Sequence, residues 1–346
     1  MEYPFLSFQE IMHISSGLLS CRKHPEYNLW ILNYTPEVQY KQKWDETLLS
    51  SRGKVVDEFG KVIARPFRKF FNIGEHASPL LPNVPYGSPF KAYEKLDGSL
   101  GICFYYKDKW NIATRGSFCS KQAEKAQKLL KNYDCSALNR QHTYLFEILS
   151  EESRVVVRYE KEELVLLGAI ETSTGKEIDP EYLESLPFRK PSIYNVSDIS
   201  ELSLNKNNFE GYVIKFDNGL RVKVKLDEYL KVHRIICGFS ANRVWEALSS
   251  GVDLESDIIN LPDEFHAEML QVVYDIQDNF SKTKSLYEKK FAELELDSLS
   301  RKEKAIKIQQ FCKQNTDFNV STLYSLLDSN EVKFHKNCWN LVKPPQ

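Results

Sequence analysis

The sequence KLDGS at residues 95–99 decides the prediction of both fold and function. It comes directly before residues 99–106, an apolar run with the length and composition of a β-strand. Alone, the motif is weak evidence, because a turn capped by Asp97, with Gly98 at positive φ, also explains these residue types. The sequence on either side must therefore distinguish a reactive Lys95 from an ordinary loop.

Six further motifs accompany this lysine in a fixed order along the chain. They are Ser51-Arg52-Gly53, Arg65-Pro66-Phe67-Arg68-Lys69-Phe70-Phe71-Asn72, Thr114-Arg115-Gly116, Phe146-Glu147, Glu210-Gly211-Tyr212 and Val222-Lys223-Val224-Lys225. Lys223 and Lys225 are two residues apart in a strand-like run, so their side chains point to one face. Taken alone, this pair would indicate a solvated strand face. With the other motifs it favours a phosphate-binding site.

The chemistry of phosphoryl transfer explains why these residue types belong together. A lysine that attacks a phosphate must be neutral, whereas the pKa of an unperturbed lysine is about 10.4. A cationic, partly desolvated pocket lowers that pKa, and the same cations offset charge on the phosphates. Glu147 lies in an apolar run, where a carboxylate is costly unless it is paired or engaged. The set favours a functional site around Lys95 over an ordinary turn.

In order and spacing, these motifs resemble those of the covalent nucleotidyltransferases, the superfamily of ATP- and NAD-dependent ligases and capping enzymes. Within it, RPFRKFFN ahead of the lysine, together with FEGYVIKF and VKVKLDEY, makes residues 30–235 similar to the type-1 RNA ligases of T-even phages. The resemblance implies an ATP-dependent RNA ligase. Such an enzyme forms a lysyl-AMP, transfers AMP to an RNA 5′-phosphate and seals that end to a 3′-hydroxyl.

The resemblance also implies a role for each motif residue. Lys95 is the catalytic nucleophile and Glu210 a ligand of Mg²⁺ or Mn²⁺. The nucleotide-binding residues, Lys95 included, are Arg52, Lys69, Glu94, Lys95, Arg115, Glu147, Lys223 and Lys225. Arg115 departs from the lysine that phage enzymes often have there, which leaves its contact open. Two further points stay open: whether Asp97 contacts metal or only shapes the loop, and whether Tyr34 packs on adenine or belongs to the core.

The sequence predicts an α+β fold in two domains. Residues 1–238 are expected to form an adenylyltransferase domain of antiparallel sheets and helices, and residues 239–346 an all-helical C-terminal domain. Strands are predicted at 99–106, 111–114, 144–149, 154–159, 164–170, 211–216 and 220–225, the last two joined by the turn at 217–219. Helices are predicted at 120–130, 263–294, 300–313 and 321–327. The absence of predicted strands after residue 240 argues against the barrel appended to DNA ligases and capping enzymes.

Composition limits the classes of protein that remain. The start of the chain lacks the order of a signal peptide, and no apolar run approaches the roughly 18 residues that span a bilayer. A cytoplasmic protein without membrane contact is therefore expected. The 7 cysteines contain no C-x-x-C pair, which argues against a zinc site or a disulfide framework. The net charge of −2 means that RNA binding must depend on the local placement of charge.

The expected partners are ATP and RNA with 5′-phosphate and 3′-hydroxyl ends, cleaved tRNA among them, and an end-healing kinase or phosphatase. One alternative is a related enzyme with the same lysine chemistry, a DNA ligase or an mRNA-capping guanylyltransferase. The other is a non-catalytic RNA-binding protein on the same scaffold. Basic clusters in the predicted helices at 263–294 and 300–313 are interleaved with glutamates, so RNA contact and a solvated helix face both stay open.

Overall fold

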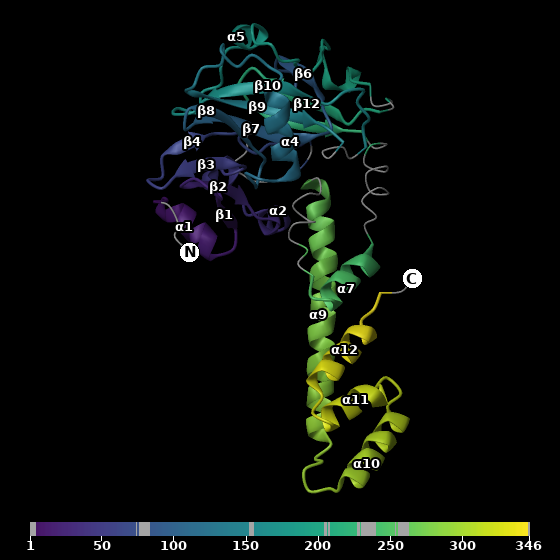
Figure 1. The fold of residues 1–346 in the computed structure, drawn as a ribbon. Helices are drawn as coiled ribbons and strands as arrows, with labels where there is room; N and C mark the ends of the chain where they lie inside the picture. The colour runs from purple at the N-terminus through teal and green to yellow at the C-terminus, as the bar shows by residue number, and fades with distance from the viewer. Residues whose placement is uncertain are drawn as a thin grey trace. The chain divides into compact units, whose positions relative to one another are not determined.

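A computed structural model describes the greater part of the chain, in two compact units, Met1–Gly238 and Phe239–Gln346. The described residues are 5–73, 75, 84–151, 156–203, 206, 208–226, 229, 240–252, 254 and 263–344. In Figure 1 the first unit contains all the labelled strands, and the second contains helices. The predicted α+β fold class, with antiparallel sheets followed by a helical region, is confirmed.

Two four-stranded antiparallel sheets pack against each other in the first unit. The first has the order β1 (Leu19–Lys23), β2 (Leu29–Tyr34), β3 (Lys54–Asp57) and β4 (Val62–Ala64). The second has the order β10 (Glu163–Glu171), β9 (His142–Leu149), β7 (Ser99–Tyr106) and β8 (Lys109–Ala113). Fully buried Leu29 and Ile31 of the first sheet share a core cluster with Ile102 and Leu145 of the second. Trp30 and Leu32, on the opposite face of β2, belong to a second apolar cluster, so both faces of this strand are buried.

The third sheet positions the motif residues. Its order is β11 (Ile193–Tyr194), β6 (Phe90–Lys95), β12 (Gly211–Phe216), β13 (Arg221–Lys225) and β5 (Phe71–Asn72). All pairs are antiparallel except β13 with β5. Lys95 lies opposite Gly211, and Gly211 lies opposite Lys225. Three motifs far apart in the sequence therefore meet at one end of this sheet.

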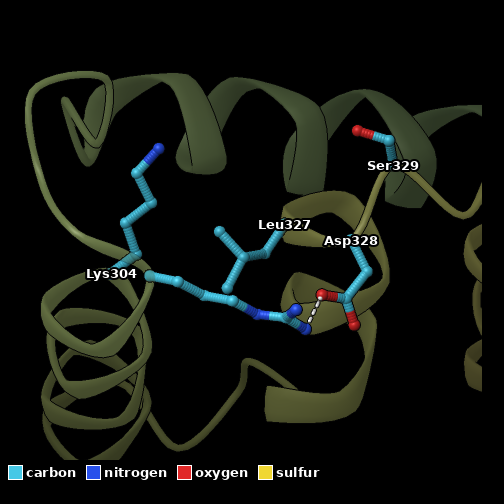
Figure 2. A pocket seen from close by; sticks show the side chains of 5 residues that line it. Lys304, Leu327, Asp328 and Ser329 are labelled. Atoms are coloured by element: carbon cyan, nitrogen blue, oxygen red, sulfur yellow. Dashed lines mark hydrogen bonds and ion pairs between the residues drawn. The ribbon is translucent and has the colours of Figure 1, made fainter.

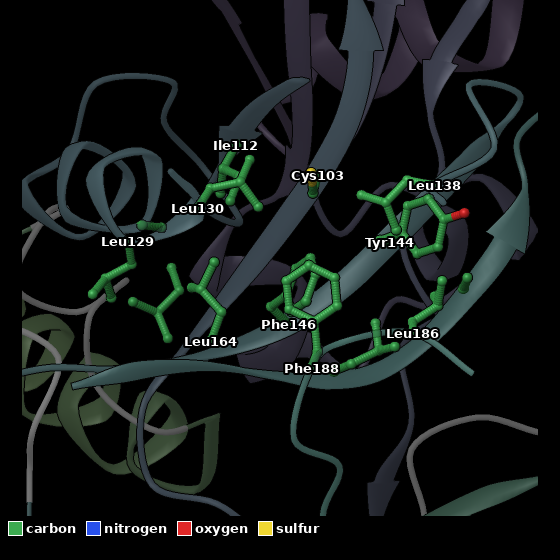
Figure 3. Close-up of a cluster of buried hydrophobic side chains, with 14 residues drawn as sticks. Cys103, Ile112, Leu129, Leu130, Leu138, Tyr144, Phe146, Leu164, Leu186 and Phe188 are labelled. Atoms are coloured by element: carbon green, nitrogen blue, oxygen red, sulfur yellow. The ribbon is translucent and has the colours of Figure 1, made fainter. Parts of the chain in front are cut away.

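Short helices cover the sheets of the first unit. They are α1 (Phe8–Ser15), α2 (Pro36–Lys41), α3 (Glu46–Ser50), α4 (Lys121–Leu130) and α5 (Pro180–Glu184), with a 3₁₀ turn at Ile199–Glu201. The apolar face of α4, with Leu129 and Leu130, packs against strand residues that include Phe146 and Leu164 (Figure 3). Burial of such side chains contributes roughly 1.5–3 kcal/mol each, so this cluster anchors the strand that carries Glu147.

Among residues 240–252, 254 and 263–344, the second unit contains helices joined by turns and no strand. Its helices are α7 (Ala241–Ser249), α9 (Asp263–Glu293), α10 (Arg301–Gln314), α11 (Val320–Leu327) and α12 (Glu331–Leu341). Phe280 of α9 stacks on Trp339 of α12 at 4.2 Å between ring centroids, and the Trp245 indole N–H donates to the carbonyl of Trp339. Among the described helices, none is both long and apolar enough to cross a membrane.

One predicted strand is wrong. Residues 154 and 155 of the predicted strand 154–159 lie outside the described part, and Val156–Tyr159 form no strand. The apolar, β-branched composition misled the prediction, because these residues bind a side chain and not a neighbouring strand. The N–H groups of Val156 and Val157 both donate to Asp97 Oδ2 at 2.7 Å. The remaining predicted elements match described strands or helices to within two residues at each end.

Candidate active site

Lys95 is the last residue of β6 and lies beside a buried carboxylate. Its Nζ is 2.6 Å from Glu210 Oε1, and Nζ of Lys225 is 3.1 Å from the same oxygen. The Glu210 side chain is only 3% exposed, whereas that of Lys95 is 20% exposed. The structure therefore brings these three predicted residues together, with Lys95 the one that remains accessible.

Glu210 changes the electrostatic picture drawn from the sequence. The sequence suggested that Lys223 and Lys225 surround Lys95 with positive charge. Instead, Lys225 shares one carboxylate oxygen with Lys95, so part of the positive charge is compensated within the site. An ammonium paired with a carboxylate is not nucleophilic. Attack by Lys95 thus requires that its proton leaves, after which Glu210 stays paired with Lys225.

Glu147 lies on β9, and its carboxylate contacts the KLDGS loop. Its Oε1 accepts a hydrogen bond from the Gly98 N–H at 3.0 Å. Burial raises the pKa of Glu147 to about 8; the Lys95 ammonium opposes the rise, and the Glu210 carboxylate adds to it. A carboxyl with such a pKa can be either charged or neutral at physiological pH, which is typical of functional sites.

We expect Glu147 to make the metal-free protein less stable as the pH rises from about 4.5 to about 8. Below this window the carboxyl is protonated in both the folded and the unfolded chain, and above it both are ionised. Within the window the unfolded chain releases the proton while the folded protein retains it, so the free energy of unfolding falls with pH.

Urea unfolding of the wild type and of Glu147→Gln, at a series of pH values across this window, checks the expectation. Gln resembles the protonated acid in shape, keeps an oxygen for the Gly98 N–H and does not titrate. The stability of the variant relative to the wild type should therefore increase with pH. Parallel stability curves for the two proteins would contradict the assigned pKa.

Asp97 is held entirely by groups of the protein. Its carboxylate is 3% exposed; Oδ2 accepts from the N–H groups of Val156 and Val157, and Oδ1 accepts from the Tyr229 hydroxyl at 2.9 Å. Its own N–H donates to the Tyr159 hydroxyl at 2.7 Å. These four contacts support the role of shaping the loop beside Lys95. Sequence reasoning missed Tyr159, although Tyr229 stood in a quoted motif.

Gly98 is required by a close approach and not by positive φ. A Cβ at this position would lie 2.4 Å from the carbonyl oxygen of Ile148 and 3.1 Å from Cγ of Glu147. Only glycine lets the loop pack directly on β9. The positive-φ turn considered from the sequence is therefore not the reason for this residue.

We expect Gly98→Ala to lower the free energy of unfolding by about 2 kcal/mol, because the added methyl group meets backbone that cannot move without disturbing β9. Denaturant unfolding measures this directly. Gly116→Ala is the matched control: its Cβ would meet nothing closer than 4.0 Å, so its stability should stay near that of the wild type. Equal stabilities of the two variants would show that the loop can shift.

Arg52 and Arg115 come together through the glycine that follows Arg52. A Cβ on Gly53, whose φ is +91°, would lie 3.3 Å from Cα of Arg115 and 2.3 Å from Cδ1 of Ile102. The charge of Arg52 also lowers the pKa of Glu147, the smallest of the charge effects on that group. Two predicted binding residues thus lie near the Lys95 group, on turns that touch each other.

Lys69 and Lys223 are buried among aromatic rings. Lys69 is 3% exposed, and its Nζ lies 4.8 Å from the ring centroid of Phe71. Lys223 is 8% exposed, 5.9 Å from the ring of Phe70. A solvated strand face is therefore the wrong interpretation of Lys223. Tyr34 is 2% exposed within the core of α1–α3 and the first sheet, which supports its core role.

The carboxylate of Glu94 lies apart from Lys95 and Glu210. Successive residues of a strand point to opposite faces, so Glu94 and Lys95 diverge. Glu94 Oε2 is 3.7 Å from the Arg189 guanidinium and 3.5 Å from the N–H of Ser192. The structure therefore does not bring the Glu94 side chain to Lys95 and Glu210, and its role in nucleotide binding stays a prediction.

The donor set fits a nucleotide with a divalent cation. Among the described residues, no three acidic, histidine or cysteine side chains form a metal cluster. Mg²⁺ needs few protein carboxylates, because waters and phosphate oxygens complete its octahedron. Glu210, buried and already bound to two cations, is the carboxylate that suits this chemistry.

A surface hollow in the helical unit has mixed charge. Figure 2 shows it where α10 meets the end of α11, lined by Arg301, Lys304, Leu327, Asp328 and Ser329. Arg301 is paired with Asp328 at 2.6 Å. On α9, Lys282 pairs with Asp278 at 2.6 Å and Lys290 with Glu293 at 2.7 Å. These pairs favour a solvated, charge-compensated helix face for this unit.

Comparison with known proteins gives a consistent result. The family model for RNA ligases of the T4 type-1 group matches residues 50–229, more than half of the chain and all nine predicted site residues. A protein of Thermovibrio ammonificans named "Putative RNA ligase" is 32% identical over 191 residues, and the match covers 50% of this chain and 50% of the relative. A "Putative bifunctional polynucleotide kinase/RNA ligase" of Autographa californica nuclear polyhedrosis virus is 28% identical over 253 residues.

The chain spans only part of these relatives: 50% of the first and 34% of the viral protein. The match to the viral protein covers 62% of this chain. A solved structure of a Naegleria gruberi RNA ligase mutant with ATP and Mn has 18% identity and a TM-score of 0.37, and it covers 43% of this chain and 52% of that one. The family match over more than half of the residues is decisive: the chain belongs to the RNA ligase family.

Proposed function

We propose that the protein is an ATP-dependent RNA ligase that uses Lys95 as its nucleophile. The observation that carries the proposal is the accessible Lys95 amine, 2.6 Å from a buried Glu210 that also holds Lys225. The chain belongs to a family of RNA ligases, and its Glu210 can stay paired with Lys225 when Lys95 reacts. This arrangement suits covalent catalysis on a phosphate by Lys95. We propose further that residues 1–238 are the adenylyltransferase domain and residues 239–346 a helical appendage.

The proposed reaction has three balanced steps. The neutral amine of Lys95 attacks the α-phosphorus of ATP; an N–P bond forms, the bond to the pyrophosphate oxygen breaks, and the amine loses its proton. A 5′-phosphate oxygen of RNA then attacks the lysyl-AMP, which breaks the N–P bond and returns a proton to Lys95. Finally, a 3′-hydroxyl attacks the 5′-phosphorus, loses its proton and displaces AMP.

The chain's own residues bind and orient the reactants in this scheme. Lys223 and Lys225, with Arg52, Lys69 and Arg115, would offset phosphate charge, where positioning and electrostatics do most of the catalytic work. Glu147 would contact the nucleotide ribose. Mg²⁺ or Mn²⁺, held by Glu210, waters and phosphate oxygens, would neutralise charge on the transferred group.

The substrate is proposed to be broken RNA, tRNA among the candidates, in the cytoplasm. Its ends would be prepared by a separate kinase or phosphatase. The name of the viral relative, which joins a polynucleotide kinase to an RNA ligase, supports a functional link between the two activities.

The test is incubation of purified protein with Mg²⁺ and α-labelled ATP, GTP or NAD, followed by denaturing electrophoresis. Acid-labile label from ATP alone, as a phosphoramidate requires, is the expected result. Label from GTP would instead indicate a capping-type enzyme. A folded protein, free of bound AMP, that takes up no label would favour the non-catalytic RNA-binding alternative and overturn the proposal.

A further inference from the structure

Asn33, near the end of β2, is a buried amide with an unsatisfied oxygen. The residue is 3% exposed, and its Oδ1 has no hydrogen-bond partner among the residues that the structure describes. A buried polar atom without a partner destabilises the folded protein. On the same strand face, Ile31 contributes to the apolar core between the two sheets. An apolar residue at position 33 would therefore serve the fold better than an amide does.

The position of Asn33 offers a reason for this cost. The N–H of Gly53 donates to the carbonyl of Leu32 at 2.9 Å, so the Arg52–Gly53 turn is bonded to the residue before Asn33. A Cβ on Gly116 would lie 4.0 Å from Asn33 Nδ2, and one on Gly53 would lie 3.3 Å from Cα of Arg115. Asn33 is thus next to the junction of the two arginine motifs.

We propose that Asn33 is a binding residue whose Oδ1 accepts a hydrogen bond from a ribose hydroxyl. An amide oxygen needs a donor, and an ionised phosphate has none. The adjacent arginine motifs suit phosphate, since guanidinium groups bind it in a bidentate manner. In a ribonucleotide the donors nearest to phosphate are the sugar hydroxyls. The ribose belongs either to ATP or to the RNA end, and the inference rests on the proposed ligase function.

The main variant is Asn33→Leu, which keeps the branched side chain with the same number of heavy atoms and removes the amide. Because an unpaired buried oxygen is lost, we expect its melting temperature to equal or exceed that of the wild type. Asn33→Asp keeps acceptor oxygens and removes the donor, and Asn33→Ala serves if leucine prevents folding. Asn28→Leu is the matched control, because Asn28 precedes the same strand at its other end, is exposed and bonds only to Glu58 among the described residues.

Two rate ratios locate the ribose. The first compares ATP with 2′-deoxy-ATP and 3′-deoxy-ATP in formation of the protein–AMP adduct. The second compares RNA acceptors ending in ribose or in 2′-deoxyribose, during sealing of a pre-adenylylated strand. In one of these arms, Asn33→Leu should lose about tenfold of the wild-type preference for the hydroxyl, the effect of one hydrogen bond. Asn33→Asp and Asn28→Leu should keep the preference.

The outcomes separate the inference from the function beneath it. Wild-type adduct formation, with both ratios unchanged in Asn33→Leu, overturns the inference alone. An equal loss of rate on ribose and deoxyribose substrates, found in both Asn33→Leu and Asn33→Asp, also overturns the inference. It would mean that Nδ2 donates to phosphate. A marked fall in the stability of both Asn33→Leu and Asn33→Ala would make Asn33 a structural residue and also overturn it. If the wild type takes up label from none of the three nucleotide donors, the proposed function is overturned as well.

Discussion

Lys95→Ala is expected to abolish both the labelled protein–AMP adduct and the joining of RNA ends. The amine supplies the nitrogen of the N–P bond, so no other side chain can replace it without forming a different adduct. Covalent and electrostatic contributions of this kind account for many orders of magnitude in rate, and loss to below detection is the expected size of the effect. Labelling with α-labelled ATP, before and after acid treatment, measures the first step in isolation.

Lys91→Ala is the matched control for this variant. Lys91 lies four residues earlier on β6 and, by strand alternation, on the same face, but it is exposed and pairs across the sheet with Lys215. It should label like the wild type. A second comparison uses a strand already carrying AMP at its 5′ end: Lys95→Ala should still seal it, because the lysine acts before that stage. Adduct formation by Lys95→Ala would refute the assignment of the nucleophile.

Asp97→Ala is expected to be the most destabilising of the single changes in the site. It would leave two backbone N–H groups, those of Val156 and Val157, and the Tyr229 hydroxyl without their acceptor in a buried place. Each unsatisfied buried donor costs about 1–3 kcal/mol, so the free energy of unfolding should fall by about 3 kcal/mol or more. Urea unfolding at neutral pH measures it, and labelling should fall with it as the Lys95 loop loses its support.

The control is Asp134→Ala, because Asp134 is exposed and accepts a single backbone hydrogen bond, from Ser136 at 2.9 Å. Its loss should cost no more than about 1 kcal/mol. Asp97→Asn should fall between the two, since it keeps one oxygen but turns an N–H group toward donors. A stable Asp97→Ala that nevertheless fails to label would instead point to a direct role of Asp97 at the metal.

The sequence was informative where one local pattern determines the structure. The apolar run at Ser99–Tyr106 and the β-rich run at Gly211–Phe216 were predicted without error, and helical spacing predicted α4 and α9. The order of motifs placed Lys95, Glu210 and Lys225 in one site, and strand pairing brings them together.

The sequence was uninformative where long-range contacts decide. Val156 and Val157 have strand-forming side chains, yet an aspartate some sixty residues away takes both of their N–H groups. The ion pair between Lys95 and Glu210 was also missed, because a pattern that groups cations does not say which of them shares a carboxylate. Asn33 carried no signal at all, since an asparagine beside a tyrosine is unremarkable until its missing partner is seen.

The pairing of β6, β12 and β13 makes the site sensitive to the length of its strands. Side chains alternate with a period of two, so a slip of one residue sends every side chain of a strand to the other face. In β13 such a slip would replace Lys223 and Lys225 with Val222 and Val224 at the site. Residues can be added at the turn 217–219 without this consequence, whereas a single insertion inside β13 would exchange its charged face for its apolar one. Evolution within this fold is therefore free to vary the hairpin tip and is constrained, residue by residue, along the strands.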